Sequence, residues 1–284
     1  MGSDAPRRRV DRELVRRGLV PSREEAQRVI GLRRVQVDGA PVGKPSTLVR
    51  TDQQLLVGGP PPRFVSRGGE KLQAALDTFA PPVAGTRVLD AGSSTGGFTD
   101  CLLQAGASSV VGVDVGYGQL ADRLRRDPRV ELHERTHVRD VDAALLGGPV
   151  DALVADLSFI SLTGVLPHLL PLVRPDGWAI VLVKPQFEVG RRRVGRGGVV
   201  RDPAARHDAL TAVAEAARRS GWPLAGVCPS PLRGAAGNVE YLAHLSPSAD
   251  PARAPALLAA LPSPDDVAPD DGVPATEEPA EVDA

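Results

Sequence analysis

The segment VLDAGSSTGGFTD at residues 88–100 restricts the fold more than any other part of the chain. An apolar run reaches Asp90 and passes through a turn that contains Gly92, Gly96 and Gly97 into a helical pattern. In open α/β sheets, such a turn joins a strand to a helix N-terminus, where backbone can approach a ligand closely and negative charge is favoured. The segment therefore predicts a βα unit with a ligand site at its turn.

The same alternation of strands and helices continues over residues 64–245. Apolar runs typical of strands occur at 86–92, 109–115, 129–134, 150–159, 177–185, 224–230 and 238–246. Helical patterns occur at 68–79, 95–106, 162–173 and 203–221. This order predicts an α/β fold with a doubly wound, Rossmann-like sheet.

A smaller α/β unit is expected before it, over residues 7–57. A helix over 9–17 would end at Gly18, and Ser22 with Glu25 forms a capping box for a second helix that would end at Gly31. Short strands should flank a turn at residues 38–39. The predicted boundaries are a first domain at 1–58, a proline-stiffened linker at 59–66, a second domain at 67–246 and a disordered acidic tail at 247–284.

The formal net charge of −1 conceals a strong asymmetry. Residues 1–71 hold fifteen Lys and Arg against eight acids, whereas residues 246–284 hold one Arg against nine acids. The basic head suggests a polyanionic partner, although a solvated charged surface is the alternative.

Only three lysines occur, Lys44, Lys71 and Lys184, against 31 arginines. Because an ammonium is a compact donor that can lose its proton, these positions are expected to be ones where arginine cannot serve.

Acidic side chains end two of the predicted strands. Asp114 follows Asp90 by 24 residues, a spacing at which an acid can bind ribose hydroxyls. The spacing alone does not separate NAD from S-adenosylmethionine, but the D-x-G start and the missing third glycine favour S-adenosylmethionine. A purely structural glycine turn remains the alternative.

Two further strands end in Asp156 and Lys184, at the edge where open α/β sheets bind ligands. Burial of Lys184 at this rim would favour the neutral amine, which can act as a base. The alternative is a simple salt bridge between the two side chains.

At this point the chain resembles the FtsJ-like ribose methyltransferases. Lys71 in SRGGEKL, Asp156 in ADLSFIS, Lys184 in VKPQFEVG and Glu240 in GNVEYL match the Lys-Asp-Lys-Glu tetrad of that family. The chain to about residue 246 is similar to the TlyA family of rRNA 2′-O-methyltransferases, whose older name is haemolysin. The head resembles the alpha-L RNA-binding motif through LVRRGLVPSREEAQRVI, VQVDG and VGKP.

The resemblance implies a cytidine-2′-O-methyltransferase that uses S-adenosylmethionine and acts on 16S or 23S rRNA, or both, within ribosomal subunits. The tetrad would be catalytic, and no metal ion is implied. The implied cofactor-binding residues are Asp90, Gly92, Ser93, Ser94, Thr95, Gly96, Gly97, Phe98, Asp114 and Asp140. This sequence departs from the family at His137, where Asn is usual, at Phe64, where Trp is usual, and around Gly31.

Basic residues of the head, the linker and a later loop are the expected RNA contacts. They are Arg7, Arg8, Arg12, Arg16, Arg23, Arg28, Arg33, Lys44, Arg63, Arg67, Arg191, Arg192 and Arg193. For the last three, within VGRRRVGRGGVVRD, the alternative is a solvated mobile loop.

Composition sets the remaining expectations. The polar start, the two unrelated cysteines and the lack of an apolar stretch of about 18 residues predict a cytoplasmic monomer without stable membrane association. Three other functions stay open: a ribosome-binding or assembly factor without catalysis, a membrane-active haemolysin, and a methyltransferase for small molecules.

Overall fold

The computed structural model describes residues 5–59, 62–234 and 236–262. Their contacts divide the chain into two compact units, one that ends at Pro62 and a larger one that begins at Arg63. Each unit has its own hydrophobic core.

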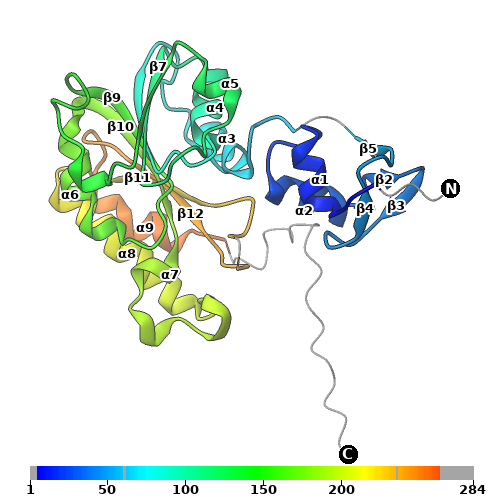
Figure 1. Cartoon of the computed structure of the whole chain (residues 1–284). Coiled ribbons are helices and arrows are strands. Elements are labelled where there is room, and N and C mark those ends of the chain that lie inside the picture. The colour runs from blue at the N-terminus through cyan, green and yellow to red at the C-terminus, as the bar shows by residue number, and fades with distance from the viewer. Residues whose placement is uncertain (1–4, 60–61, 235, 263–284) are drawn as a thin grey trace, which may run out of the picture. The chain divides into compact units, whose positions relative to one another are not determined.

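The first unit contains two small antiparallel sheets and two helices (Figure 1). Its elements are β1 (Arg7–Arg9), α1 (Val10–Arg16), α2 (Arg23–Gly31), β2 (Val35–Val37), β3 (Ala40–Val42), β4 (Leu48–Arg50) and β5 (Leu55–Val57). β1 pairs with β4, and β2 lies between β3 and β5. The core between helices and sheets includes Leu14, Ile30 and Val35, all fully buried.

Local sequence explains most of this unit. Ser22 Oγ accepts a hydrogen bond from the Glu25 backbone N–H at 3.1 Å, which confirms the predicted cap of α2. Asp38 and Gly39 have φ of 49° and 83°, as a tight turn between paired strands requires. α2 ends at Gly31 as expected, and Gly18 follows the end of α1 with a φ of 67°. One expectation was wrong: the first helix starts at Val10, not at Arg9, because Arg9 belongs to β1, which pairs with β4.

The larger unit holds all seven predicted strands. They are β6 (Arg87–Ala91), β7 (Ser109–Asp114), β8 (Val130–Glu134), β9 (Val150–Ala155), β10 (Val173–Val183), β11 (Leu224–Pro229) and β12 (Tyr241–Leu245). They form one sheet in the order β11-β12-β10-β9-β6-β7-β8, in which β12 is antiparallel to both of its neighbours. The expected doubly wound sheet is confirmed.

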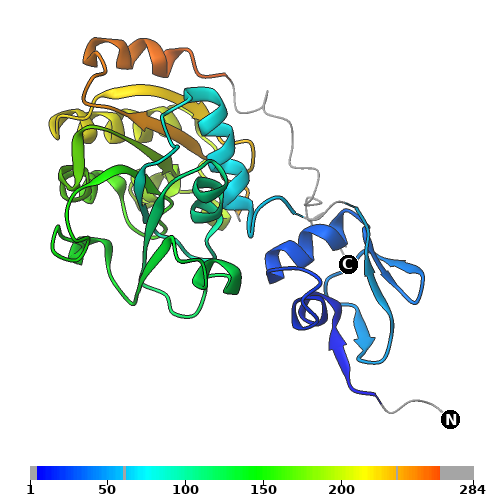
Figure 2. The same ribbon diagram turned by 90° about the horizontal axis from the view of Figure 1, so that it is seen from above.

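Helices cover both faces of this sheet (Figures 1 and 2). They are α3 (Arg67–Phe79), α4 (Gly97–Gln104), α5 (Asp122–Arg125), α6 (Leu166–Leu169), α7 (Pro185–Glu188), α8 (Pro203–Arg219) and α9 (Ala254–Ala259). α3 and α4 pack together on one face, and α6, α8 and α9 cover the other. Alternate strand residues enter the two cores: Leu153 faces one and Val154 the other.

The sequence mispredicted two helical regions. The helix expected at 162–173 is divided into a short α-helix between two 3₁₀ turns, and Pro167 and Pro171 lie in the first turns of the second and third pieces, where proline is tolerated. Part of the expected disordered tail is ordered, because α9 packs on α8 and β11 and its Leu258 is buried. Residues 263–284 of that tail lie outside the described residues.

The predicted linker also differs from expectation in its second half. Phe64 is buried in the core of the larger unit, and the Val65 backbone N–H donates to Asp100 Oδ2 of α4 at 2.9 Å. The Phe64 ring fills the space above Gly69, where a Cβ would lie 2.3 Å from it. Among the described residues, no helix is both long and apolar enough to cross a membrane.

Candidate functional site

Strand register brings the predicted tetrad to one edge of the sheet. Val183 of β10 lies opposite Tyr241 of β12 in an antiparallel pair, so Lys184, which follows Val183, and Glu240, which precedes Tyr241, lie at the same level. Asp156 follows the end of β9, which is the other neighbour of β10. Lys71 comes from α3, which contacts β12. Four residues far apart in sequence therefore meet where β9 and β10 end and β12 begins.

The tetrad consists of two ion pairs. Lys71 Nζ lies 2.5 Å from Glu240 Oε2, and both side chains are buried. Lys184 Nζ lies 2.6 Å from Asp156 Oδ1, with angles outside those of a hydrogen bond, and donates a hydrogen bond to Ser158 Oγ at 2.9 Å. The salt bridge weighed as an alternative is thus present, and it forms one half of the larger cluster. No sequence pattern predicted the hydrogen bond between Lys184 and Ser158.

A tight loop before β12 shapes the place of Glu240. At Gly234, a Cβ would lie 2.4 Å from Glu240 Oε1, so any larger residue would displace the carboxylate. The buried side chain of Asn238 accepts a hydrogen bond from Val200 N–H and donates one to the Gly198 carbonyl, both at 2.9 Å. Sequence reasoning missed both residues: Asn238 bonds to a segment about 40 residues away, and Gly234 shows its role only once the loop has folded back on Glu240.

The glycine-rich turn lies on the same edge, after β6. Asp90 is fully buried, and its Oδ2 accepts a hydrogen bond from Thr99 Oγ1 at 2.6 Å. Burial raises the pKa of Asp90 to about 7, and the nearby Asp156 adds to the shift, while the Thr99 hydrogen bond opposes it. Asp90 Oδ1 and Ser93 Oγ are buried with no hydrogen-bond partner among the described residues.

Close packing accounts for the three glycines of the turn. A Cβ at Gly92 would lie 2.5 Å from the Asp156 carbonyl oxygen, and one at Gly96 would lie 2.3 Å from Leu124 Cδ1. At Gly97 it would lie 2.3 Å from Ser66 Oγ, where the start of α3 meets the start of α4. The glycines therefore have a structural reason of their own, and the evidence for a ligand rests on the polar groups around them.

Asp114 supplies the clearest of these polar groups. Its Oδ2 accepts a hydrogen bond from the Ser94 backbone N–H at 2.8 Å, and its Oδ1 accepts one from Gly116 N–H at 2.6 Å. Each oxygen keeps a second lone pair, so the carboxylate is held in place and can still accept from two neighbouring hydroxyls.

The other predicted pocket residues differ in exposure. Ser94 is exposed and Thr95 partly buried, whereas Phe98 packs in the core and supports the turn from beneath. Asp140 is exposed in the 3₁₀ turn Val138–Asp140, in which the Arg139 backbone N–H donates a hydrogen bond to His137 Nδ1 at 3.1 Å. His137 thus performs a capping role for this turn.

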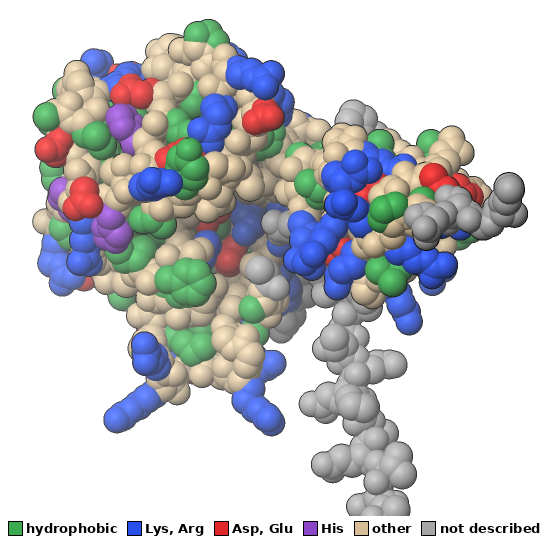
Figure 3. Space-filling view, viewed as in Figure 1, with side chains coloured by type: hydrophobic (Ala, Val, Ile, Leu, Met, Phe, Trp, Pro, Cys, Tyr) green, Lys and Arg blue, Asp and Glu red, His purple; other side chains and the backbone are tan. Residues whose placement is uncertain are grey.

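Arginine side chains gather on the first unit, as the space-filling view shows (Figure 3). Three of the predicted RNA contacts are paired with buried acids: Arg16 with Glu13, Arg23 with Asp11, and Arg28 with Glu25. The remaining predicted contacts of this unit are exposed: Arg7, Arg8, Arg12, Arg33 and Lys44.

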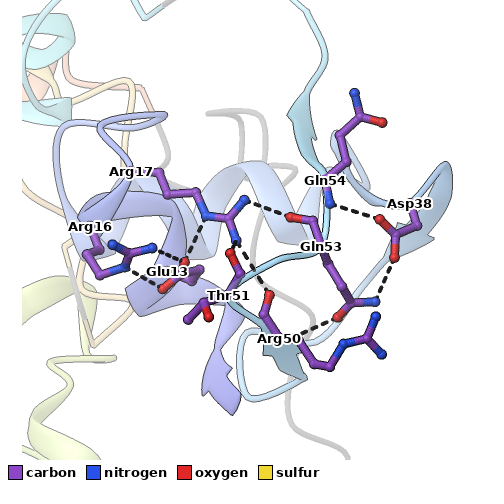
Figure 4. Close-up of polar contacts among 8 residues, drawn as sticks. All are labelled: Glu13, Arg16, Arg17, Asp38, Arg50, Thr51, Gln53 and Gln54. Atoms are coloured by element: carbon purple, nitrogen blue, oxygen red, sulfur yellow. Dashed lines mark hydrogen bonds and ion pairs between the residues drawn. The ribbon is translucent and has the colours of Figure 1, made fainter. Parts of the chain in front are cut away.

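Buried acids fix the arginines of this unit in place (Figure 4). Glu13 also accepts from Arg17 Nε at 2.8 Å, and Arg17 reaches the carbonyls of Thr51 and Gln53 at 2.9 and 2.7 Å. Hydrogen bonds from Arg16 and Arg17 outweigh the effect of burial and lower the pKa of Glu13 to about 2. Arg17 is therefore a structural link between α1 and the turn after β4.

The arginine-rich loop after α7 is folded, unlike the mobile loop considered as an alternative. Val189 and Val200 are buried in a small cluster of their own with residues of α8. Arg191, Arg192 and Arg193 are all exposed, and Arg193 also pairs with Asp208 at 2.6 Å and with Asp202 at 3.5 Å. In the linker region, Arg63 is exposed over the Phe64 ring, and Arg67 is partly buried.

An aromatic pair flanks the Asp156–Lys184 ion pair. Phe159 is 92% exposed with φ of 65°, and its ring centroid lies 5.3 Å from that of Phe187. A large apolar side chain held outward in a strained backbone conformation is a candidate ligand contact.

The sheet order, the acid-containing glycine turn and the Lys-Asp-Lys-Glu cluster together define an α/β methyltransferase. The FtsJ-like methyltransferase model matches residues 64–246, and the S4 domain model matches residues 8–55. The chain therefore belongs to the FtsJ-like methyltransferase family, and its N-terminal unit is an S4 domain.

Individual relatives agree with this assignment. The chain is 53% identical over 247 residues to the 16S/23S rRNA (cytidine-2′-O)-methyltransferase TlyA of Mycobacterium tuberculosis, covering 87% of this chain and 92% of that protein. It is 37% identical to Hemolysin A of Brachyspira hyodysenteriae over 83% of this chain and 98% of the relative. A solved structure named as a hemolysin of Streptococcus thermophilus shares 38% identity and a TM-score of 0.71, covering 90% of this chain and 95% of the other.

Proposed function

We propose that this chain uses S-adenosylmethionine to methylate the ribose 2′-hydroxyl of cytidine in 16S or 23S rRNA, or both, within ribosomal subunits. The observation that carries the proposal is the assembly of the two ion pairs on the same sheet edge as Asp114 and the glycine-rich turn. The named activity of the M. tuberculosis relative supports the choice of RNA and of cytidine.

The residues of the turn fit the proposed cofactor. Asp114 is held so that it can accept from two ribose hydroxyls, and Asp90 Oδ1 and Ser93 Oγ retain hydrogen-bonding capacity beneath the turn. Bound there, S-adenosylmethionine would supply the electrophilic methyl group. Gly92 and Ser94 to Gly97 would line the backbone side of the pocket, with Phe98 supporting them from the core and Asp140 at its rim.

The tetrad would prepare the ribose hydroxyl for attack. The hydroxyl is a weak nucleophile, and its proton must leave as the oxygen attacks. Lys184 Nζ would assist loss of that proton or stabilise the developing alkoxide, and Asp156 would orient Lys184 and the hydroxyl. The buried Lys71–Glu240 pair would flank the ribose and fix its position.

The RNA would be gripped by exposed basic side chains of both units. In the S4 domain these are Arg7, Arg8, Arg12, Arg33 and Lys44, with Arg16, Arg23 and Arg28 as paired members of the same surface. On the methyltransferase unit, Arg63, Arg67, Arg191 and Arg192 would contribute, and the exposed Phe159 ring offers a face on which a base can stack.

Substitution of Lys184 tests the catalytic assignment. Lys184→Ala should reduce methyl transfer from labelled cofactor to ribosomal subunits by about 100-fold or more, the scale of a lost general acid–base or electrostatic group. Cofactor affinity, measured by calorimetry, should stay within about twofold of wild type, because the glycine turn is left intact. Arg174, an exposed residue on β10, offers the control substitution Arg174→Ala.

Two results would contradict the proposal. Turnover of Lys184→Ala at the wild-type rate would remove Lys184 from the chemistry. Failure of the wild-type protein to bind S-adenosylmethionine would favour a ribosome-binding factor without catalysis.

A further inference from the structure

A partly buried carboxylate that the proposed chemistry does not use joins the two loops of the active site. Glu188 is the last residue of α7, four positions after Lys184. Its Oε2 accepts a hydrogen bond from Ser161 Oγ at 2.6 Å, and its Oε1 accepts one from the Leu162 backbone N–H at 2.8 Å. Ser161 and Leu162 lie beyond Asp156 in the loop that follows β9.

The direction of these hydrogen bonds follows from chemistry. An ionised carboxylate only accepts, so the single Ser161 hydroxyl proton points to Glu188. Ser161 Oγ also lies 2.7 Å from Thr163 Oγ1, and Thr163 must then be the donor of that bond. The result is a directed chain from Thr163 through Ser161 to Glu188. Burial raises the pKa of Glu188, as expected for a carboxylate enclosed between two segments.

The two loops are therefore tied at both ends. At the sheet edge, Lys184 meets Asp156 and Ser158, and further out Glu188 meets Ser161 and Leu162. Phe159 lies between these ties with a positive φ. A non-glycine residue keeps such a conformation only where the surrounding structure enforces it.

We propose that Glu188 is a positioning residue for methyl transfer, which holds the Asp156–Ser161 loop against the segment that carries Lys184. Without it, the loop would relax at Phe159, and Asp156 and Ser158 would lose their fixed place around the Lys184 ammonium. This proposal rests on the proposed function, because it assigns Glu188 to the geometry of the same tetrad.

Substitutions that break or preserve the tie test the proposal. Glu188→Ala removes both acceptors, and kcat for methylation of ribosomal subunits should fall by about tenfold to 100-fold, since displacements near 1 Å cost about that much. Glu188→Gln keeps an acceptor for Leu162, while its amide can donate to Ser161, whose proton then turns to Thr163. Its kcat should stay within about threefold of wild type, whereas Ser161→Ala, which loses one bond, should be intermediate.

Further measurements separate positioning from a general loss of structure. The dissociation constant for S-adenosylmethionine and the melting temperature of Glu188→Ala should stay close to wild type, because the cofactor turn belongs to other strands. Glu215, an exposed carboxylate paired with Arg218 on α8, provides the matched control Glu215→Ala, which should leave kcat unchanged.

Three outcomes would overturn the proposal. They are a wild-type kcat for Glu188→Ala, a Glu188→Gln variant as slow as Glu188→Ala, and a loss of kcat matched by equal losses of cofactor affinity and folding. Absence of methyl transfer by the wild-type protein would instead contradict the proposed function itself.

Discussion

Burial raises the pKa of Asp90, which lies near the end of β6, just before the glycine-rich turn. Its side chain has no exposed surface and its pKa is raised to about 7, whereas an unfolded Asp titrates near 4. Between these pH values the folded protein keeps a proton that the unfolded chain has lost. The stability that this proton provides is fully present below about pH 4 and is lost as pH rises through about 7.

Asp90→Asn should remove this pH dependence. The wild-type protein should lose up to about 4 kcal/mol of unfolding free energy from this group between about pH 4 and pH 7, at about 1.4 kcal/mol per unit of pKa shift. The Asn side-chain oxygen can still accept a hydrogen bond from the Thr99 hydroxyl, and the amide does not titrate. The variant should therefore not lose this unfolding free energy as pH rises. Urea unfolding at several pH values measures the difference, with the exposed Asp176→Asn as control. Parallel pH profiles for wild type and Asp90→Asn would contradict the assignment.

Single residues also show where sequence reasoning stops. Asp90, Asp114, Asp156 and Lys184 were found because they end apolar strands. Glu188 lies in the motif VKPQFEVG and Asn238 in the motif GNVEYL, yet their roles depend on hydrogen-bond partners 26 and 38 residues away. Contacts between residues so far apart in sequence depend on how the whole sheet packs, so no local sequence pattern predicts them.

At the scale of elements, strands with buried apolar residues were predicted from the sequence, and elements that depend on pairing or on ion pairs were not. Most strands of the large sheet were predicted because they contain runs of buried apolar residues, as in β7, β9 and the second half of β10, whereas the edge strand β8 shows only apolar–polar alternation. β1 was missed because it is three arginines, which become a strand only by pairing with Leu48 to Arg50. The loop after α7 was expected to offer three equivalent arginines, but Asp202 and Asp208 hold one of them.

The ion pairs of Arg193 predict that it contributes less to RNA binding than Arg191 and Arg192 do. Replacing exposed Arg191 and Arg192 together by Ala should weaken RNA binding and reduce the slope of log affinity against log salt by about 1.4, at about 0.7 per lost phosphate contact. Arg193→Ala should leave the slope almost unchanged but increase hydrogen exchange in the loop, because it breaks two ion pairs. Binding to an rRNA fragment at a series of salt concentrations measures the slopes. An equal effect of all three arginines would show that the ion pairs do not hold Arg193 back from RNA.

At the scale of the whole molecule, two separate cores imply two separable functions. The two-domain order followed from charge asymmetry and the proline-rich segment GGPPPR, but the sequence did not show that Phe64 and Val65 pack into the larger unit. Aromatic burial of that kind depends on the gap above Gly69, which exists only once α3 is in place.

Ile30→Ala should unfold the S4 domain while sparing the methyltransferase unit. Ile30 is fully buried, and truncation of such a residue costs about 2–5 kcal/mol, a large share of the stability of a domain of this size. RNA affinity should then fall steeply, while calorimetric binding of S-adenosylmethionine stays within about twofold of wild type. Leu56, 48% exposed on β5, provides the control Leu56→Ala, which should affect neither. Equal loss of RNA and cofactor binding in Ile30→Ala would mean that the two units fold as one.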